Sequence, residues 1–165
     1  MSSLLFSLFT VACTPFSPIL INMEDWRLGD PSQDPLAEHQ PETIDCSVTS
    51  FRIESEQLEV ETDLCNYAFV EFDLLQNVPK GAPADLLLLH TGLWAPEPAI
   101  AHTALLIDGV IFWEQEVSIP ASAEFFFYEG EFPIDASIGS SVQLHIHNHG
   151  ANDWRLGYFR RIEEE

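Results

Sequence analysis

Hydrophobic and polar residues alternate strictly along the C-terminal part of the chain. Val142, Leu144 and Ile146 fall on one side of an extended segment, because successive side chains of a strand point to opposite faces. The other side carries Gln143, His145, His147 and His149. Turn-forming residues follow, and a second alternating run begins at Trp154. The pattern predicts two antiparallel strands that close an all-β domain, with a row of histidines facing away from the core.

Similar β-rich runs recur from Cys46 onward at the spacing of a sandwich. Asp108-Gly109 between two apolar runs predicts a two-residue hairpin turn. No stretch shows sustained helical periodicity. The candidate strands are 47–53, 57–61, 66–74, 85–91, 102–107, 110–116, 124–128, 141–149 and 154–162. We therefore expect an antiparallel β-sandwich of eight to nine strands.

A jelly roll is the favoured form of this sandwich, because it limits exposed sheet edges. An immunoglobulin-like sandwich is the alternative. Cys46 and Cys65 are too close in sequence for the inter-sheet bridge of such domains, and no tryptophan lies between them. The expected organisation is a signal or lipid-anchor segment (1–21), a polar tether or lead-in (22–45), the sandwich (46–162) and an acidic tail (163–165).

The N-terminus carries an apolar run, Leu4–Ala12, that is too short to span a bilayer. The end of this run together with the next residue, Thr10-Val11-Ala12-Cys13, resembles the lipobox of bacterial lipoproteins. The resemblance implies that Cys13 becomes the lipid-modified first residue and anchors the protein in the bacterial cell envelope. Plain secretion and an unprocessed apolar N-terminus stay open as alternatives.

The chain has three cysteines, an odd number for a secreted protein. If Cys13 carries lipid, Cys46 and Cys65 remain as a pair around a short loop. In an oxidising compartment a disulfide between them would stabilise the fold by about 3 kcal/mol.

Acidic residues dominate the charge of the chain, with 27 Asp and Glu against 6 Lys and Arg. The formal net charge of −21 disfavours nucleic acid, whose phosphates need clustered cations. Calcium is a plausible counter-ion for carboxylates. Solubility alone would also explain this charge.

His145 and His147 could hold one zinc or copper ion, because they lie two positions apart on a strand and their rings point to the same side. His90 and His102 end apolar runs and are candidates for a third ligand. The segment LHIHNHG is similar to the HxHxxG copper segment of copper-dependent ascorbate monooxygenases, which also use jelly-roll domains. The resemblance implies copper at the same two histidines. It does not extend to the methionine ligand of those enzymes, so oxidative catalysis is not expected. A solvent-facing or carboxylate-bonded histidine row is the alternative.

Aromatic residues are concentrated in the second half of the chain. In size and strand layout the domain is similar to jelly-roll carbohydrate-binding modules, which stack sugars on exposed rings. That likeness implies a ligand site at Trp154 with Asn152, Asp153 and Arg155. Core packing of these rings is the alternative. Consecutive Phe125, Phe126 and Phe127 cannot all face one core, so at least one ring must face outward.

Catalytic motifs are absent from the sequence: it has no GxSxG, no HExxH and no phosphate-binding glycine loop. No spacing selects a catalytic pair of carboxylates. We expect a non-catalytic binding or structural module of the cell envelope, with a glycan or an envelope protein as partner. A metal-binding jelly roll is the alternative, and a small metalloenzyme is less favoured.

Overall fold

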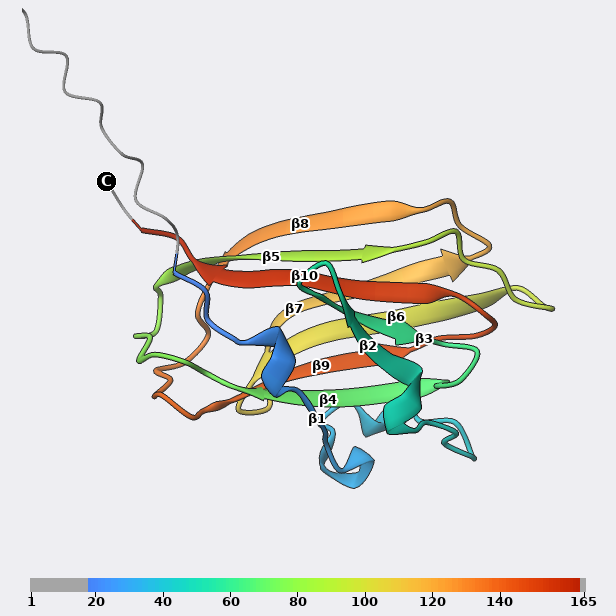
Figure 1. The fold of residues 1–165 in the computed structure, drawn as a ribbon, viewed down its shortest axis with the longest axis horizontal. Coiled ribbons are helices and arrows are strands. Elements are labelled where there is room, and N and C mark those ends of the chain that lie inside the picture. Colours follow the sequence, from blue (N-terminus) through green and yellow to red (C-terminus); the bar gives the residue numbers. More distant parts are fainter. Residues whose placement is uncertain (1–17, 164–165) are drawn as a thin grey trace, which may run out of the picture.

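Ten strands form two five-stranded antiparallel sheets in the computed structural model, which describes residues 18–163. Sheet I has the order β1-β4-β9-β6-β7 and sheet II the order β2-β3-β10-β5-β8. Figure 1 looks onto sheet II, with sheet I behind it. Sheet I contains β1 (Arg27–Leu28), β4 (Tyr67–Asp73), β9 (Ser141–His147), β6 (Ala99–Ile107) and β7 (Val110–Ile119). Sheet II contains β2 (Phe51–Glu54), β3 (Gln57–Glu61), β10 (Asp153–Arg161), β5 (Pro83–His90) and β8 (Glu124–Glu131).

The strand order is that of a jelly roll, as the sequence predicts. From β3 to β10 each connection crosses to the other sheet, except the β6–β7 hairpin. That hairpin turns at Asp108 and Gly109, which both have positive φ, as a two-residue turn of this kind requires. All nine predicted runs contain a strand. The tenth strand, β1, has two residues and lies in the segment expected to be a tether.

The core lies between the two sheets and is built from one side chain in two along each long strand. Val142, Leu144 and Ile146 of β9 are fully buried in it, as predicted. From sheet II, β5 adds Ala84, Leu86 and Leu88. Burial of each large aliphatic side chain contributes about 1.5–3 kcal/mol, so this two-residue pattern fixes the register of the strands.

The segment 22–45, expected to be a polar tether or lead-in, packs on the sandwich. Just before it, Leu20 and Ile21 are fully buried in the core. After η1 (Met23–Asp25), β1 pairs with β4. The segment then crosses the outer face of sheet I in two further 3-10 turns, η2 (Pro31–Gln33) and η3 (Ala37–His39). Leu36 packs there on Ala104 and Leu106 of β6, so a few apolar residues hold this otherwise polar segment against the fold.

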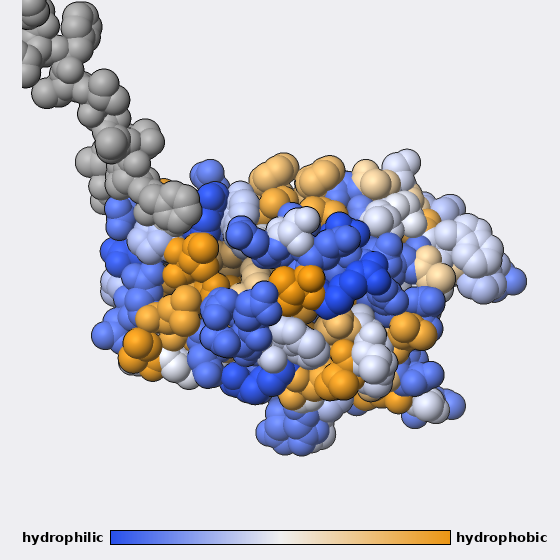
Figure 2. Space-filling view, viewed as in Figure 1, coloured by the Kyte–Doolittle hydropathy of each residue, from blue (hydrophilic) through white to orange (hydrophobic). Residues whose placement is uncertain are grey.

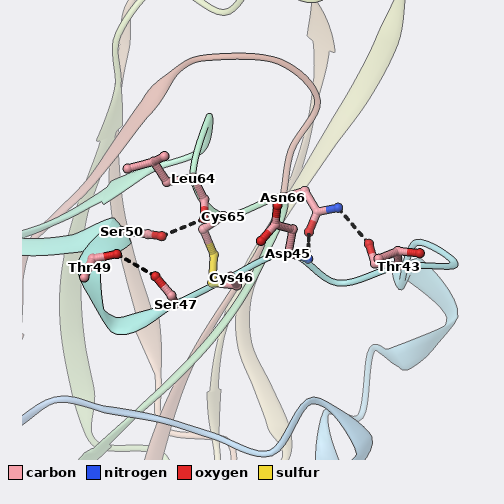
Figure 3. Close-up of a disulfide and its surroundings, with 9 residues drawn as sticks. All are labelled: Thr43, Asp45, Cys46, Ser47, Thr49, Ser50, Leu64, Cys65 and Asn66. Carbon is pink, nitrogen blue, oxygen red and sulfur yellow. Dashed lines mark hydrogen bonds between the residues drawn. A yellow bond between two sulfur atoms is a disulfide. The ribbon is translucent and has the colours of Figure 1, made fainter.

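Cys46 and Cys65 form the predicted disulfide, which Figure 3 shows. The bridge joins the chain just before η4 (Val48–Ser50) and β2 to the chain just before β4. Around it, Asn66 accepts a hydrogen bond from the Asp45 amide and donates one to the Thr43 carbonyl. The disulfide therefore ties an edge of sheet II to sheet I.

Residues 18–163 include no helix with the length and hydropathy needed to cross a bilayer. The acidic tail predicted at 163–165 lies mostly outside these residues.

Candidate functional site

Five of the six histidines gather on the outer face of sheet I, under or beside the segment 34–40. They are His39 of η3, His102 of β6, His145 and His147 of β9, and His149 just after β9. The sequence predicts that the β9 histidines face away from the core, and they do. The sequence leaves open a solvent-facing or a carboxylate-bonded row, and His145 is of the second kind: it is 0% exposed, because the N-terminal segment covers it, and it bonds Asp34.

His145 is held by a buried carboxylate. Its Nδ1 lies 2.7 Å from Oδ2 of Asp34, and the Tyr67 hydroxyl donates to the same oxygen, also at 2.7 Å. Burial raises the pKa of Asp34, but the hydrogen bonds from His145 and Tyr67 outweigh it, so the net shift is downward. Burial and then Asp34 raise the pKa of Tyr67. Nε2 of His145 is buried and has no hydrogen-bond partner.

Beside this pair lies a group of two imidazoles and one carboxylate. The rings of His39 and His102 stack with centroids 3.8 Å apart and planes 8° from parallel. Nε2 of His102 lies 2.7 Å from Oε1 of Glu114, on the neighbouring strand β7. The His145 ring lies edge-on to His102, with centroids 5.0 Å apart. One ligand atom from each of His39, His102 and Glu114 falls within 4.8 Å of the other two.

His147 and His149 continue the cluster toward its exposed end, with ring centroids 4.7 Å apart. Burial lowers the pKa of His147 to about 4, and the charges of His149, His145, His39 and His102 add to the effect. His147 is therefore neutral at physiological pH.

His90 does not join this cluster, contrary to the expectation that it could be a third metal ligand. Its ring lies between the sheets, packed on Trp154 and Phe126. It sits on the face of β5 that carries the core residues, whereas His102 sits on the outer face of sheet I. The sequence placed His90 and His102 at strand ends but could not tell whether each side chain would lie on the inner or the outer face of its sheet.

The residues predicted to bind a sugar around Trp154 have structural roles. Trp154 is 0% exposed, so its ring offers no face to a ligand, and its indole N–H donates to the side chain of Asn148. Asn152 is buried, and its side chain bonds the backbone of Trp94 and His149. Arg155 pairs with Glu54 and the buried Glu59. Asp153 lies opposite Glu61 in the register of β10 and β3, and its backbone N–H donates to the Thr91 hydroxyl.

A groove of about 750 Å³ lies instead on the outer face of sheet II, a size typical of ligand sites. Leu87 of β5 and Gly157, Tyr158 and Arg160 of β10 line it from the sheet. The segment 19–24 and the β2–β3 turn form its sides. The Arg160 guanidinium lies 3.7 Å from the centroid of the Tyr158 ring and pairs with Asp85. The groove thus combines an apolar floor with hydrogen-bonding groups.

Phe125 and Phe127 of β8 extend this apolar surface to the edge of sheet II. They are 60% and 71% exposed, and their rings lie 6.2 Å apart and 9° from parallel. Phe127 pairs with Leu87 of the groove and Phe125 with Leu89. Figure 2 shows hydrophobic side chains along β8, at the upper edge of this face. We call these two rings the β8 platform.

The sequence contained a signal for the platform but not for the groove. Alternation over Phe125, Phe126 and Phe127 requires outward rings, and Phe126 turns inward onto Trp113 and Trp154. His39 and Glu114 were missed as partners of the histidines, because nothing local to either residue indicates their meeting. Cys13, the predicted lipid site, lies outside the described residues.

No family model and no curated protein matches the chain. Among solved structures, a CBM4 module shares 10% identity with it, covering 86% of this chain and 97% of the module, with a TM-score of 0.46. TmCBM61 in complex with β-1,4-galactotriose shares 12% identity, covering 87% and 91%, with a TM-score of 0.39. An arabinose-bound MgGH51 α-L-arabinofuranosidase shares 10%, covering 88% of this chain and 26% of the enzyme, with a TM-score of 0.42. None of these scores reaches 0.5, so they carry no weight for the ligand.

Proposed function

We propose that the protein is a non-catalytic carbohydrate-binding module of the bacterial cell envelope, which binds glycan through the β8 platform and the adjoining groove. The observation that carries the proposal is the pair of exposed, nearly parallel rings of Phe125 and Phe127 on one sheet face. Large exposed apolar patches mark interaction surfaces, and a flat ring suits the C–H face of a sugar.

Polar groups next to the rings support a sugar rather than a purely apolar partner. Asp85 lies on β5, the strand next to β8, and pairs with Arg160 of β10. Glu129 of β8 lies opposite Asp85. These side chains can bond sugar hydroxyls beside the platform. With a net charge of −21, the protein would repel polyanionic glycans, so we expect neutral polysaccharides as ligands.

The test is retention by polysaccharides in affinity electrophoresis, with a β-glucan, a xylan, a β-1,4-galactan and the anionic polygalacturonate. We expect at least one neutral polysaccharide to retard the wild type. Replacing both Phe125 and Phe127 by Ala should weaken that binding at least tenfold, about 1.4 kcal/mol. Both rings are exposed, so the free energy of unfolding should change by about 0.5 kcal/mol or less.

Ile100→Ala is the matched control, because Ile100 is a large exposed apolar residue on sheet I. It should bind like the wild type. Equal binding by the platform variant, or no retardation by any neutral polysaccharide, would overturn the proposal.

We further propose that the lipobox-like segment anchors the protein through Cys13. The Cys46–Cys65 disulfide supports export, because such bridges persist in oxidising compartments. Replacing Cys13 by Ser should move the protein from the membrane fraction to the soluble fraction of cells that express it. Unchanged partitioning, measured by fractionation and blotting, would contradict the anchor.

A further inference from the structure

We propose that His39, His102 and Glu114 form a binding site for a divalent first-row transition ion such as zinc, on the covered face of sheet I. The site is independent of the proposed glycan surface, which lies on sheet II. It differs from the pair His145 and His147 that the sequence suggests, because a turn and two strands supply its ligands.

The three ligand atoms already lie close together. They fall within 4.8 Å of one another, whereas the ligands of a tetrahedral zinc ion are roughly 3.3 Å apart. A shift of at most about 1.5 Å closes the difference between these two distances. His39 can supply the shift, because it is only half-buried and ends a short turn. Nε2 of His102 and Oε1 of Glu114 already meet at 2.7 Å.

The chemistry of the ligand set selects the class of ion. Two imidazoles and one carboxylate suit zinc and its neighbours, whereas calcium takes oxygen ligands.

Two buried ring nitrogens of the histidine cluster have no hydrogen-bond partner. They are Nδ1 of His102 and Nε2 of His145. Asp34 fixes the orientation of the His145 ring through the bond to Nδ1. His145 is therefore a positioning residue that packs edge-on to His102, and is not itself one of the three ligands.

The test is titration of the untagged, metal-stripped full-length protein with zinc, in competition with a chromophoric zinc indicator. We expect one equivalent of zinc to bind and to raise the Tm. Replacing His39 by Asn or Glu114 by Gln should weaken binding at least tenfold. Both residues are outside the core, so the unbound variants should keep the fold of the wild type. Millimolar calcium should not compete.

Two control variants separate direct coordination of zinc from nonspecific electrostatic attraction of the cation to this face. Glu116 lies two residues from Glu114 on β7, directly opposite His102, so Glu116→Gln removes the same charge. His149→Asn removes an exposed imidazole of the same cluster. Both should bind zinc like the wild type. Equal losses in E114Q and E116Q, equal losses in H39N and H149N, or less than a tenth of an equivalent bound would overturn the proposal.

Discussion

Asp34 shows how one residue decides the environment of another that lies far away in the chain. It precedes His145 by 111 residues, yet its carboxylate bonds the His145 ring. The same oxygen accepts the hydrogen bond from Tyr67. Removing one partner of such a buried group leaves the others unsatisfied, which costs about 1–3 kcal/mol. The alternation of β9 shows which way His145 points, but no local pattern reveals that Asp34 will cover it.

His147 makes the stability of the fold sensitive to acid. Its pKa is about 4 in the folded protein and about 6.5 in the unfolded chain, so between these values only the unfolded chain binds the proton. Stability should therefore fall as the pH drops from 7 toward 4. Below that range Asp34, whose folded pKa is lowered, adds a further loss.

The expected loss at His147 is about 1–2 kcal/mol between pH 7 and pH 4.5, because solvent screens part of the effect at a half-buried group. Urea unfolding at both pH values measures it. Replacing His147 by Gln should flatten this dependence, while His149→Asn should leave most of it. An equal pH dependence in the His147 variant would contradict the assignment.

At the scale of elements, periodicity predicted much of the fold. All nine expected strands are present, and alternation correctly divided β9 and β8 into inner and outer residues. The same alternation placed the phenylalanines of the platform outside. The sequence did not predict contacts between segments that are distant along the chain. Trp154 alternates with Leu156 on the apolar side of β10 and lies between the sheets beside His90 and Phe126, so the likeness to carbohydrate-binding modules, and not the alternation, misplaced it.

The disulfide acts at this scale too, because it joins the start of β2 to the start of β4. Cys46 and Cys65 are 19 residues apart. For a loop of this length the chain-entropy model gives a loss of about 3 kcal/mol on reduction. Urea unfolding with and without a thiol reductant should show this loss in the wild type. The variant with both cysteines replaced by Ser should resemble the reduced protein and ignore the reductant. Equal stability of all samples would contradict this role.

At the scale of the molecule, the two sheets present different outer faces. Sheet I is covered by the segment 34–40, which encloses the histidine cluster, whereas sheet II leaves its groove and the β8 platform open. Composition could not reveal this difference, since histidines and phenylalanines occur on strands of both sheets. The net charge of −21 should repel polyanions from the molecule as a whole.

The packing of Leu20 and Ile21 has a consequence for where such a protein would work. The described part of the chain begins at residue 18, and residues 19–24 form one side of the groove. Ile19 is six positions after Cys13. A lipid on Cys13 would therefore hold Ile19 within about 20 Å of Cys13, even with the chain between them fully extended. The groove would then sample polymers lying just above the bilayer surface and would be out of reach of those farther out.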